Sequence, residues 1–311
     1  MEYIASVQRQ RGARALNRLA IITRANFLPL TVVIVCAGLA AALYAHGVFH
    51  PLDAFLILIG ALLTHMAVNV FNNYFDYRSK LDARTTKTPF SGGIDIIVNG
   101  EMKPGTAFGI GLACLLGAAG IGGYFLSHTF YPLFPILLYG LLTICLYSPI
   151  LAKIHGLSEI VAGSGFGLMA LGTYVVQAGV IDGTGISVLV PITILVALLL
   201  FLNEFPDAEA DKTAGRRHLV ILLGKRTSAR IYVLGLVATY ASIIAAVAAG
   251  VAPLAALVSL ATIPIAYKAG RISLKNYDEV PKLIPALASN VIMILSTIVL
   301  LAAGFLIGFF V

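Results

Sequence analysis

The chain has 311 residues, of which 59% are hydrophobic and only 11% are charged, and its mean hydropathy is +0.95. This composition excludes an ordinary soluble protein and a disordered chain, because charges are sparse and long aliphatic runs recur along the sequence. The formal net charge of +7 does not indicate a nucleic-acid partner, since the cations are spread through short polar segments between apolar runs.

Nine apolar segments are long enough to be membrane spans, each of which needs about 20 apolar residues. We place them at residues 27–45, 52–73, 106–126, 130–149, 158–180, 186–205, 230–249, 251–268 and 284–310. Pro253 and Pro264 interrupt the eighth of these segments. The sequence therefore predicts an all-α, polytopic membrane protein with nine transmembrane helices.

The polar segments between these spans predict the domain organisation and the orientation of the chain. All 21 Lys and Arg residues fall in segments on one side of the nine spans. By the positive-inside rule, this side is cytoplasmic, so we expect a multi-pass protein of the cell membrane with its N-terminus cytoplasmic and its C-terminus outside. Residues 1–311 then form a single transmembrane domain, with a cytoplasmic arm at 1–25 and two long cap loops at 74–105 and 206–229.

The second span ends in a cluster of amides and acids at the cytoplasmic side. Asn72 and Asp76 are four residues apart, so on a helix they share one face, with Asn69 and Asn73 beside them. A further acid, Asp82, follows in the loop.

The sixth span ends in the same way. Asn203, Asp207 and Asp211 form a face with a spacing of four residues, and Pro206 is expected to interrupt the helix there. One such motif alone is more typical of a solvated helix end whose acids pair with nearby cations. Two copies, each closing an apolar span and each followed by a basic loop, indicate a functional duplication.

Carboxylates gathered at a membrane interface need a cation to neutralise their repulsion. Magnesium prefers oxygen ligands and completes its shell with water and substrate phosphates. Two Asp-rich helix ends that face each other therefore predict a Mg²⁺-assisted diphosphate site. Basic residues nearby are candidates for binding the phosphates, and each is explained equally by positive-inside anchoring: Arg78, Lys80, Lys87 and Lys153.

The two motifs and the nine spans together resemble the UbiA superfamily of intramembrane prenyltransferases over nearly the whole chain. Arg24 and Asn26 at the opening of the first span are similar to that family, as are Tyr147 and Ser148 with Lys153 after the fourth. The resemblance implies a ring of nine helices around a central cavity, capped by the cytoplasmic loops.

The resemblance also implies a reaction and a role for each site residue. A polyprenyl group passes from an allylic diphosphate to an electron-rich acceptor, with Mg²⁺ stabilising the leaving diphosphate. The implied metal ligands are Asn72, Asp76, Asp82, Asn203, Asp207 and Asp211, and the implied catalytic residues are Asp76, Asp207, Asp211 and Lys153. The implied substrate-binding residues are Arg24, Asn26, Arg78, Lys80, Lys87, Tyr147 and Ser148.

The spacing to Asp82 is similar to that of the 1,4-dihydroxy-2-naphthoate polyprenyltransferase branch, although Asn73 leaves one carboxylate fewer than the common motif. We therefore expect an aromatic, naphthoate-like acceptor in quinone (menaquinone) biosynthesis, with geranylgeranylglyceryl phosphate prenylation of archaeal-type lipid synthesis as the alternative. A secondary transporter is the rival from another class, but its site is expected near the bilayer midplane. A scaffold that organises membrane lipids ranks last, and no pattern indicates the prenyl chain length or the oligomeric state.

Overall fold

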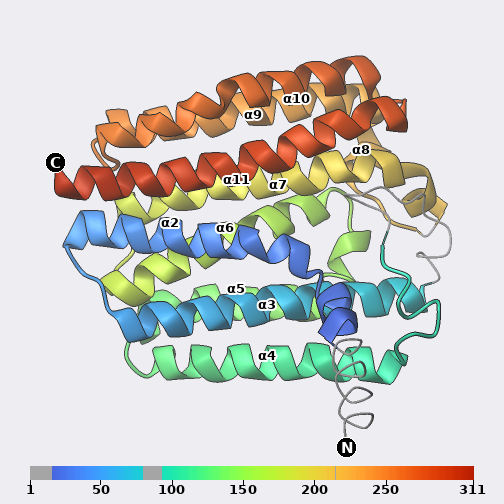
Figure 1. Cartoon of the computed structure of the whole chain (residues 1–311), viewed down its shortest axis with the longest axis horizontal. Coiled ribbons are helices and arrows are strands. Elements are labelled where there is room, and N and C mark those ends of the chain that lie inside the picture. Colours follow the sequence, from blue (N-terminus) through green and yellow to red (C-terminus); the bar gives the residue numbers. More distant parts are fainter. Residues whose placement is uncertain (1–15, 80–92, 214) are drawn as a thin grey trace, which may run out of the picture.

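The expected membrane segments are long helices that lie side by side (Figure 1). A computed structural model describes residues 16–79, 93–213 and 215–311. Within these ranges every regular element is a helix, as the all-α prediction requires. An α-helix satisfies its backbone hydrogen bonds internally, which is the condition for crossing a bilayer that contains no water.

The helices follow one another in chain order and reverse direction at each end of the bundle. The long and short α-helices are α2 (Leu28–His46), α3 (Pro51–Arg78), α4 (Pro104–Leu126), α5 (Phe130–Leu146), α6 (Leu157–Ala178), α7 (Gly183–Thr213), α8 (Leu219–Leu223), α9 (Lys225–Ala248), α10 (Ile263–Asn276) and α11 (Val280–Phe310). Short 3-10 helices are η1 (Ala25–Phe27), η2 (Leu151–Lys153) and η3 (Leu254–Thr262).

The nine expected spans correspond to helices of three kinds. In the described part of the chain, seven helices are long and apolar enough to cross a membrane: Ala25–His46, α3, α4, α6, α7, α9 and α11. α5 is a shorter apolar helix. The expected span at 251–268 is the 3-10 helix η3, which continues directly into α10 and ends at Asn276. Pro253 precedes η3 and Pro264 opens α10, so each proline lies where its missing N–H costs least.

The expected cap loop at 206–229 is largely helical, whereas the described part of the loop at 74–105 is helical only at its two ends. α3 continues to Arg78, and α7 continues through Pro206 to Thr213. The expected interruption at Pro206 is therefore wrong. A proline removes only one backbone hydrogen bond of a helix, and the following turn remains packed because Ala208 and Asp211 are buried. Among the described residues of the second loop, short stretches on either side of α8 are not helical.

The first and last long helices are neighbours, and this contact closes the ring. α2 packs against α11, while α7 packs against α6, α9, α2 and α11. Gly38 and Gly163 permit close approaches between helix backbones, because a Cβ at Gly38 would lie 2.5 Å from the Ala170 carbonyl oxygen and a Cβ at Gly163 would overlap the Thr193 carbonyl. The interpretation of the glycines of this span as packing residues is confirmed at Gly163.

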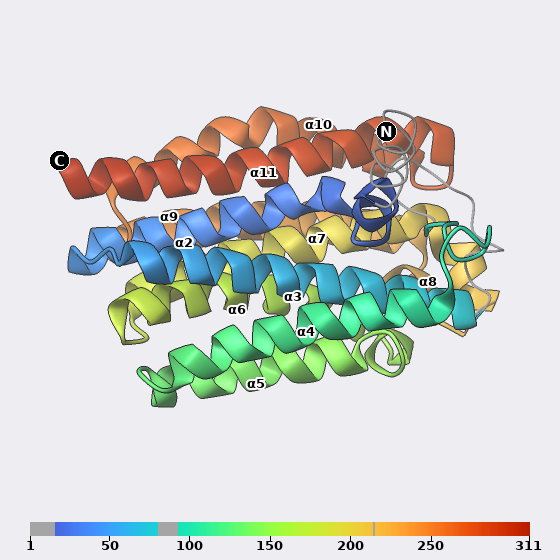
Figure 2. The same ribbon diagram turned by 60° about the horizontal axis from the view of Figure 1, so that its bottom comes forward.

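The helix ends that flank the basic segments gather at one end of the bundle in the described part of the chain. The ends of α3 and α7 lie there with α8 and the start of α9, whereas the C-terminus lies at the opposite end (Figures 1 and 2). For the basic residues that the structure describes, the segregation of charge seen in the sequence is therefore a segregation in space. Both Asn-x-x-x-Asp motifs lie at the basic end, because they close α3 and α7.

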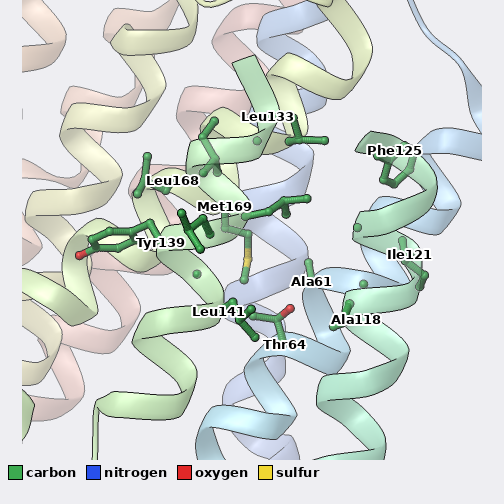
Figure 3. Close-up of a pocket in the computed structure, with 18 of the residues that line it drawn as sticks. Ala61, Thr64, Ala118, Ile121, Phe125, Leu133, Tyr139, Leu141, Leu168 and Met169 are labelled. Atoms are coloured by element: carbon green, nitrogen blue, oxygen red, sulfur yellow. The ribbon is translucent and has the colours of Figure 1, made fainter. Parts of the chain in front are cut away.

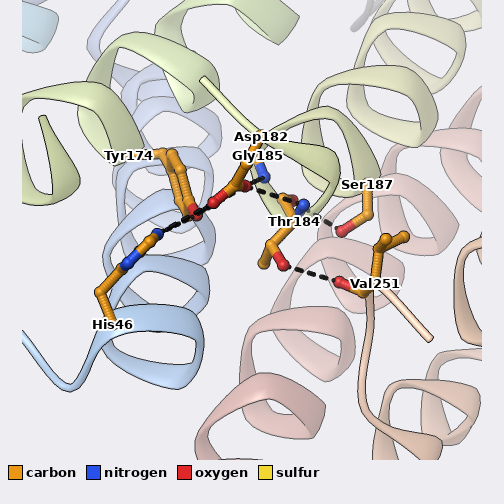
Figure 4. Close-up of polar contacts among 7 residues, drawn as sticks. All are labelled: His46, Tyr174, Asp182, Thr184, Gly185, Ser187 and Val251. Carbon is orange, nitrogen blue, oxygen red and sulfur yellow. Dashed lines mark hydrogen bonds and ion pairs between the residues drawn. The ribbon is translucent and has the colours of Figure 1, made fainter. Parts of the chain in front are cut away.

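At the opposite end, Asp182 joins α2, α6 and α7 (Figure 4). Its carboxylate accepts hydrogen bonds from the Tyr174 hydroxyl at 2.7 Å and from the backbone N–H groups of Thr184 and Gly185 at 2.9 and 3.0 Å. The His46 ring nitrogen Nε2 lies 2.9 Å from it. Burial raises the pKa of Asp182, but these hydrogen bonds and His46 outweigh burial and hold that pKa below its ordinary value. The Asp182 carboxylate therefore caps the N-terminus of α7.

Candidate active site

Polar side chains in the last turns of α3 contact two different parts of the molecule, the segment before α2 and the basic end of the bundle. Asn69 and Asn73 bind the segment that precedes α2: their amide groups donate to the carbonyl oxygens of Thr23 and Ile22, each at 2.9 Å. The Asn73 side-chain oxygen accepts hydrogen bonds from the Arg24 guanidinium at 2.8 and 3.2 Å. Asn73 is 1% exposed. Its hydrogen bonds to Arg24 and Ile22 hold the N-terminal segment, so the asparagine that replaces an acid of the common motif has a structural contact here.

Arg24 has an unusual backbone conformation at this contact. Its φ of 51° is the one positive value among the described non-glycine residues. Such a conformation is costly for a residue with a Cβ and persists only where the surroundings hold it. The two hydrogen bonds to Asn73 are such a restraint. The structure therefore gives Arg24, predicted to bind substrate, a contact with the end of α3.

Asp76 and Asp211 meet across the basic end of the bundle through Arg216. The Arg216 guanidinium donates to the Asp76 carboxylate in a short ion pair, and its Nη1 lies 3.5 Å from Oδ1 of Asp211. Burial lowers the pKa of Arg216, but the two carboxylates outweigh burial and raise it above its ordinary value. A fixed cation therefore bridges the first and second motifs, as their predicted convergence requires.

The second motif lies on α7, where the expected helical spacing brings Asn203, Asp207 and Asp211 onto one face. Asp211 is 2% exposed. The side-chain oxygen of Asn203 is buried and accepts no hydrogen bond from any described residue. A buried amide oxygen without a donor is normally satisfied by a ligand, an ion or water.

The side-chain oxygens of the two motifs suit a hard divalent cation as ligands. Asp76, Asp207, Asp211 and Asn203 supply carboxylate and amide oxygens, and the Asn203 oxygen has free acceptor capacity. Magnesium binds such oxygens and prefers them to nitrogen or sulfur. The residues of the two motifs are therefore suited to hold Mg²⁺.

The segment after α5 lies against the first motif. Ser148 donates a hydrogen bond to the side-chain oxygen of Asn72 at 3.3 Å. Tyr147 directly precedes Ser148 at the end of α5. Both residues, predicted from the family resemblance alone, thus border the site.

The remaining predicted site residues are exposed or lie outside the described ranges. Asn26 in η1, Arg78 at the end of α3 and Lys153 in η2 are exposed to solvent or lipid headgroups. Lys80, Asp82 and Lys87 fall outside the residues that the structure describes. For these six residues the assigned roles stay predictions.

Four further residues of the site did not stand out in the sequence. Arg216 was one basic loop residue among many, although its position five residues after Asp211 places it near the second motif. Glu159, Glu204 and His218 are buried close to one another, and His218 Nε2 lies 3.2 Å from Asp211 Oδ2. The sequence offered one signal for these residues: acids and a histidine border apolar runs, where burying a charge without a partner is costly, so such residues are expected to have partners.

An apolar cavity of about 330 Å³ lies between α3, α4, α5 and α6 (Figure 3). Its lining extends along α5 from Leu133 to Ile144, one turn before Tyr147. Thr64 on α3 and Tyr139 on α5 are among its few polar lining residues. The cavity therefore lies at one side of the helix ring and approaches the acidic site along α5.

Fold and site together define a multi-pass membrane protein with an acidic, oxygen-rich site at one end and an apolar cavity beside it. The UbiA prenyltransferase family matches residues 31–291. The 1,4-dihydroxy-2-naphthoate octaprenyltransferase of Bacillus subtilis (strain 168) is 30% identical over 237 residues, which cover 71% of this chain and 74% of that protein.

Solved structures show the same fold. A UbiA homolog from Aeropyrum pernix K1, in its apo form, has a TM-score of 0.66 at 19% identity and covers 86% of this chain and 95% of its own. A UbiA homolog from Archaeoglobus fulgidus bound to GPP and Mg²⁺ has a TM-score of 0.62 at 13% identity, with 91% and 99% covered. The chain belongs to the UbiA prenyltransferase family, and it is an intramembrane prenyltransferase.

Proposed function

We propose that this protein is a Mg²⁺-dependent enzyme that transfers a polyprenyl group from an allylic diphosphate to a naphthoate-like aromatic acceptor in quinone biosynthesis. The observation that carries the proposal is the convergence of Asp76 and Asp211 on Arg216 at the basic end of the bundle. The B. subtilis relative, named for a naphthoate acceptor, supports the acceptor class. The homolog bound to GPP and Mg²⁺ supports the donor and the cofactor.

The motif residues hold the cation and the diphosphate. Asp76, Asp207 and Asp211, with the Asn72 and Asn203 amide oxygens, are the proposed Mg²⁺ ligands. When bound, Mg²⁺ neutralises the charge that develops on the departing diphosphate. Arg216 exchanges a carboxylate contact for a phosphate oxygen, which places a fixed positive charge at the leaving group.

The reaction breaks the allylic C–O bond, and its electron pair leaves with the diphosphate. A ring carbon of the acceptor supplies the electron pair of the new C–C bond, and the acceptor then loses a proton or carbon dioxide. The apolar cavity beside α5 holds the prenyl tail and limits access of water to the allylic cation. Tyr147 and Ser148 border the site between the cavity and the first motif, where an acceptor is expected.

The orientation in the membrane follows from the distribution of charge. The basic end carries the site and faces the cytoplasm in our proposal, because loops rich in Lys and Arg remain on that side. The diphosphate of the prenyl donor then lies at the cytoplasmic surface.

The decisive experiment measures Mg²⁺-dependent release of diphosphate by the purified protein. Polyprenyl diphosphates are supplied with a panel of acceptors: 1,4-dihydroxy-2-naphthoate, a benzoate acceptor and geranylgeranylglyceryl phosphate. Asp76→Asn and Asp207→Asn are compared with Asp278→Asn, an exposed acid in the turn between α10 and α11. We expect turnover with the naphthoate, lost in the first two variants and retained in the third.

Different failures have different meanings. Prenylation of the glyceryl phosphate alone would correct the acceptor and keep the two-motif mechanism. A protein that neither binds nor cleaves any prenyl diphosphate with Mg²⁺ present would refute the proposed reaction. Equal activity of all three variants would refute the assigned ligands.

A further inference from the structure

A second cluster of potential metal ligands lies beside Asp211 of the second motif. Glu159 near the start of α6, Glu204 on α7 and His218 just before α8 are 3%, 7% and 2% exposed. One carboxylate oxygen from each glutamate and one ring nitrogen of the histidine all lie within 4.8 Å of one another. Three elements that are distant in sequence therefore place two acids and an imidazole around one buried point.

The histidine and one glutamate have polar atoms that no hydrogen bond satisfies. Nδ1 of His218 and Oε2 of Glu204 have no hydrogen-bond partner among the described residues, and Nε2 of His218 lies near Asp211 without the geometry of a hydrogen bond. The nearest approach between them is 3.6 Å, from Nδ1 to Oε2. Burying such groups without partners is costly, so their arrangement around one point indicates a missing ligand.

The surroundings of the cluster are those expected around metal ligands. On its far side, His218 presents Nε2 to Asp211 Oδ2 at 3.2 Å. Glu159 accepts hydrogen bonds from the backbone N–H of Leu219 at 2.8 Å and from the Ser158 hydroxyl at 2.7 Å. A metal-bound histidine usually gives its other ring N–H to a carboxylate, and ligating carboxylates are themselves held by hydrogen bonds.

We propose that Glu159, Glu204 and His218 bind a transition-series divalent cation of the Zn²⁺ type, separate from the proposed Mg²⁺ site. Its double positive charge matches the two glutamate carboxylates. An imidazole nitrogen with two carboxylates suits Zn²⁺, whereas Mg²⁺ prefers oxygen donors alone. His218 binds through Nδ1, the nitrogen that faces Glu204, and a small rotation of the ring lets Nε2–H donate to Asp211.

Small side-chain movements bring the three ligands to bonding distance. A tetrahedral ion with ligands at about 2.1 Å separates those ligands by roughly 3.4 Å. The 3.6 Å between His218 and Glu204 already approaches this value. Glu159 closes the remaining gap through its side-chain rotations, and water supplies a fourth ligand.

Such a site would connect the fold to the chemistry. The cation would link α6, α7 and the segment before α8, and His218 would hold Asp211 in the orientation in which it serves the second motif. In this arrangement Glu159, Glu204 and His218 are positioning residues, since none of them touches the diphosphate.

The test measures bound metal directly and needs no substrate. The full chain is purified in detergent without strong chelators, incubated with Zn²⁺, passed over a desalting column and analysed for Zn, Mn, Fe and Mg by mass spectrometry. We expect about one equivalent of Zn per chain. His218→Gln and Glu204→Gln are each expected to retain less than about a tenth of it, because each variant removes one of three protein ligands.

Two controls separate this site from its neighbours. His155→Gln changes an exposed histidine whose contact is with Arg217 at 2.9 Å, and it should keep the full equivalent. Asp76→Asn should keep bound Zn while it loses Mg²⁺-dependent diphosphate cleavage, so failure of this proposal and failure of the proposed reaction are distinguishable. Zn²⁺ should also raise the Tm of the wild type and of His155→Gln but not of Glu204→Gln.

Either of two results would overturn the proposal. One is a wild-type protein that retains no Zn, Mn or Fe; the glutamates then share a proton or pair with an imidazolium. The other is equal Zn content in Glu204→Gln and His155→Gln. Gel filtration identifies any variant that fails to fold, and the remaining ligand variant, or Glu159→Gln, then decides the question by the same measurement.

Discussion

Replacing Arg216 with glutamine removes the cation that bridges the two motifs. At the 3.5 Å separation from Asp211, a pair of unit charges with an effective dielectric constant of about 20 interacts by roughly 5 kcal/mol. Breaking a buried pair costs about 3 to 5 kcal/mol net. The Arg216 side chain is 24% exposed, so we expect a loss near the lower limit, about 3 kcal/mol.

The assay is thermal unfolding of the purified protein in detergent, with EDTA or with Mg²⁺. In EDTA, Arg216→Gln leaves Asp76 and Asp211 without their shared cation, and its Tm is expected to fall by roughly 5 to 10 °C. Mg²⁺ binds the variant more favourably because no fixed cation competes for the carboxylates. Added Mg²⁺ should therefore raise the Tm of the variant more than that of the wild type.

Arg217→Gln is the matched control, since Arg217 is the exposed neighbour of Arg216 and contacts His155. Its Tm should remain close to that of the wild type in both buffers. The reasoning is refuted if Arg216→Gln and Arg217→Gln melt together in EDTA. It is also refuted if Mg²⁺ raises the Tm of all three proteins equally.

Three further predictions concern the cavity, the opposite end and the N-terminal segment. Gly165 lines the cavity, and a Cβ added there would meet open space. A leucine side chain would partly fill the cavity, so Gly165→Leu should lower kcat/KM for octaprenyl diphosphate more than for geranyl diphosphate. An unchanged ratio of the two kcat/KM values would exclude this cavity as the site of the prenyl tail. The pKa of Asp182 is lower in the folded protein, so its stabilising contribution is complete above the unfolded-state pKa of about 3.9 and is lost as the pH falls through the folded-state pKa. Asp182→Asn should weaken this acid dependence of the Tm. Asn73→Ala removes two hydrogen bonds from Arg24 and one to the Ile22 carbonyl oxygen, and it should cost about 2 to 3 kcal/mol. It should also speed proteolysis near residue 24, whereas an unchanged digestion pattern would contradict the assigned contact.

The helices and the polarity of the bundle could be predicted from the sequence because their causes are local. An apolar run of membrane length must form a helix, and Lys and Arg cannot remain in the hydrocarbon region. The spacing of Asn203, Asp207 and Asp211 likewise fixes a shared face wherever the helix continues. Local reasoning failed at Pro206, because the packing of Ala208 and Asp211 keeps α7 helical beyond the proline.

The partners of each polar side chain were decided only by the tertiary structure. Asp76 and Arg216 are separated by 140 positions, and Asn73 turns from the acidic motif toward Arg24 because the segment before α2 packs there. Glu159 reaches His218 only because α6 and α7 pack together. A pattern of residue types specifies which side chains share a helix face, whereas contacts between helices depend on how the whole bundle packs.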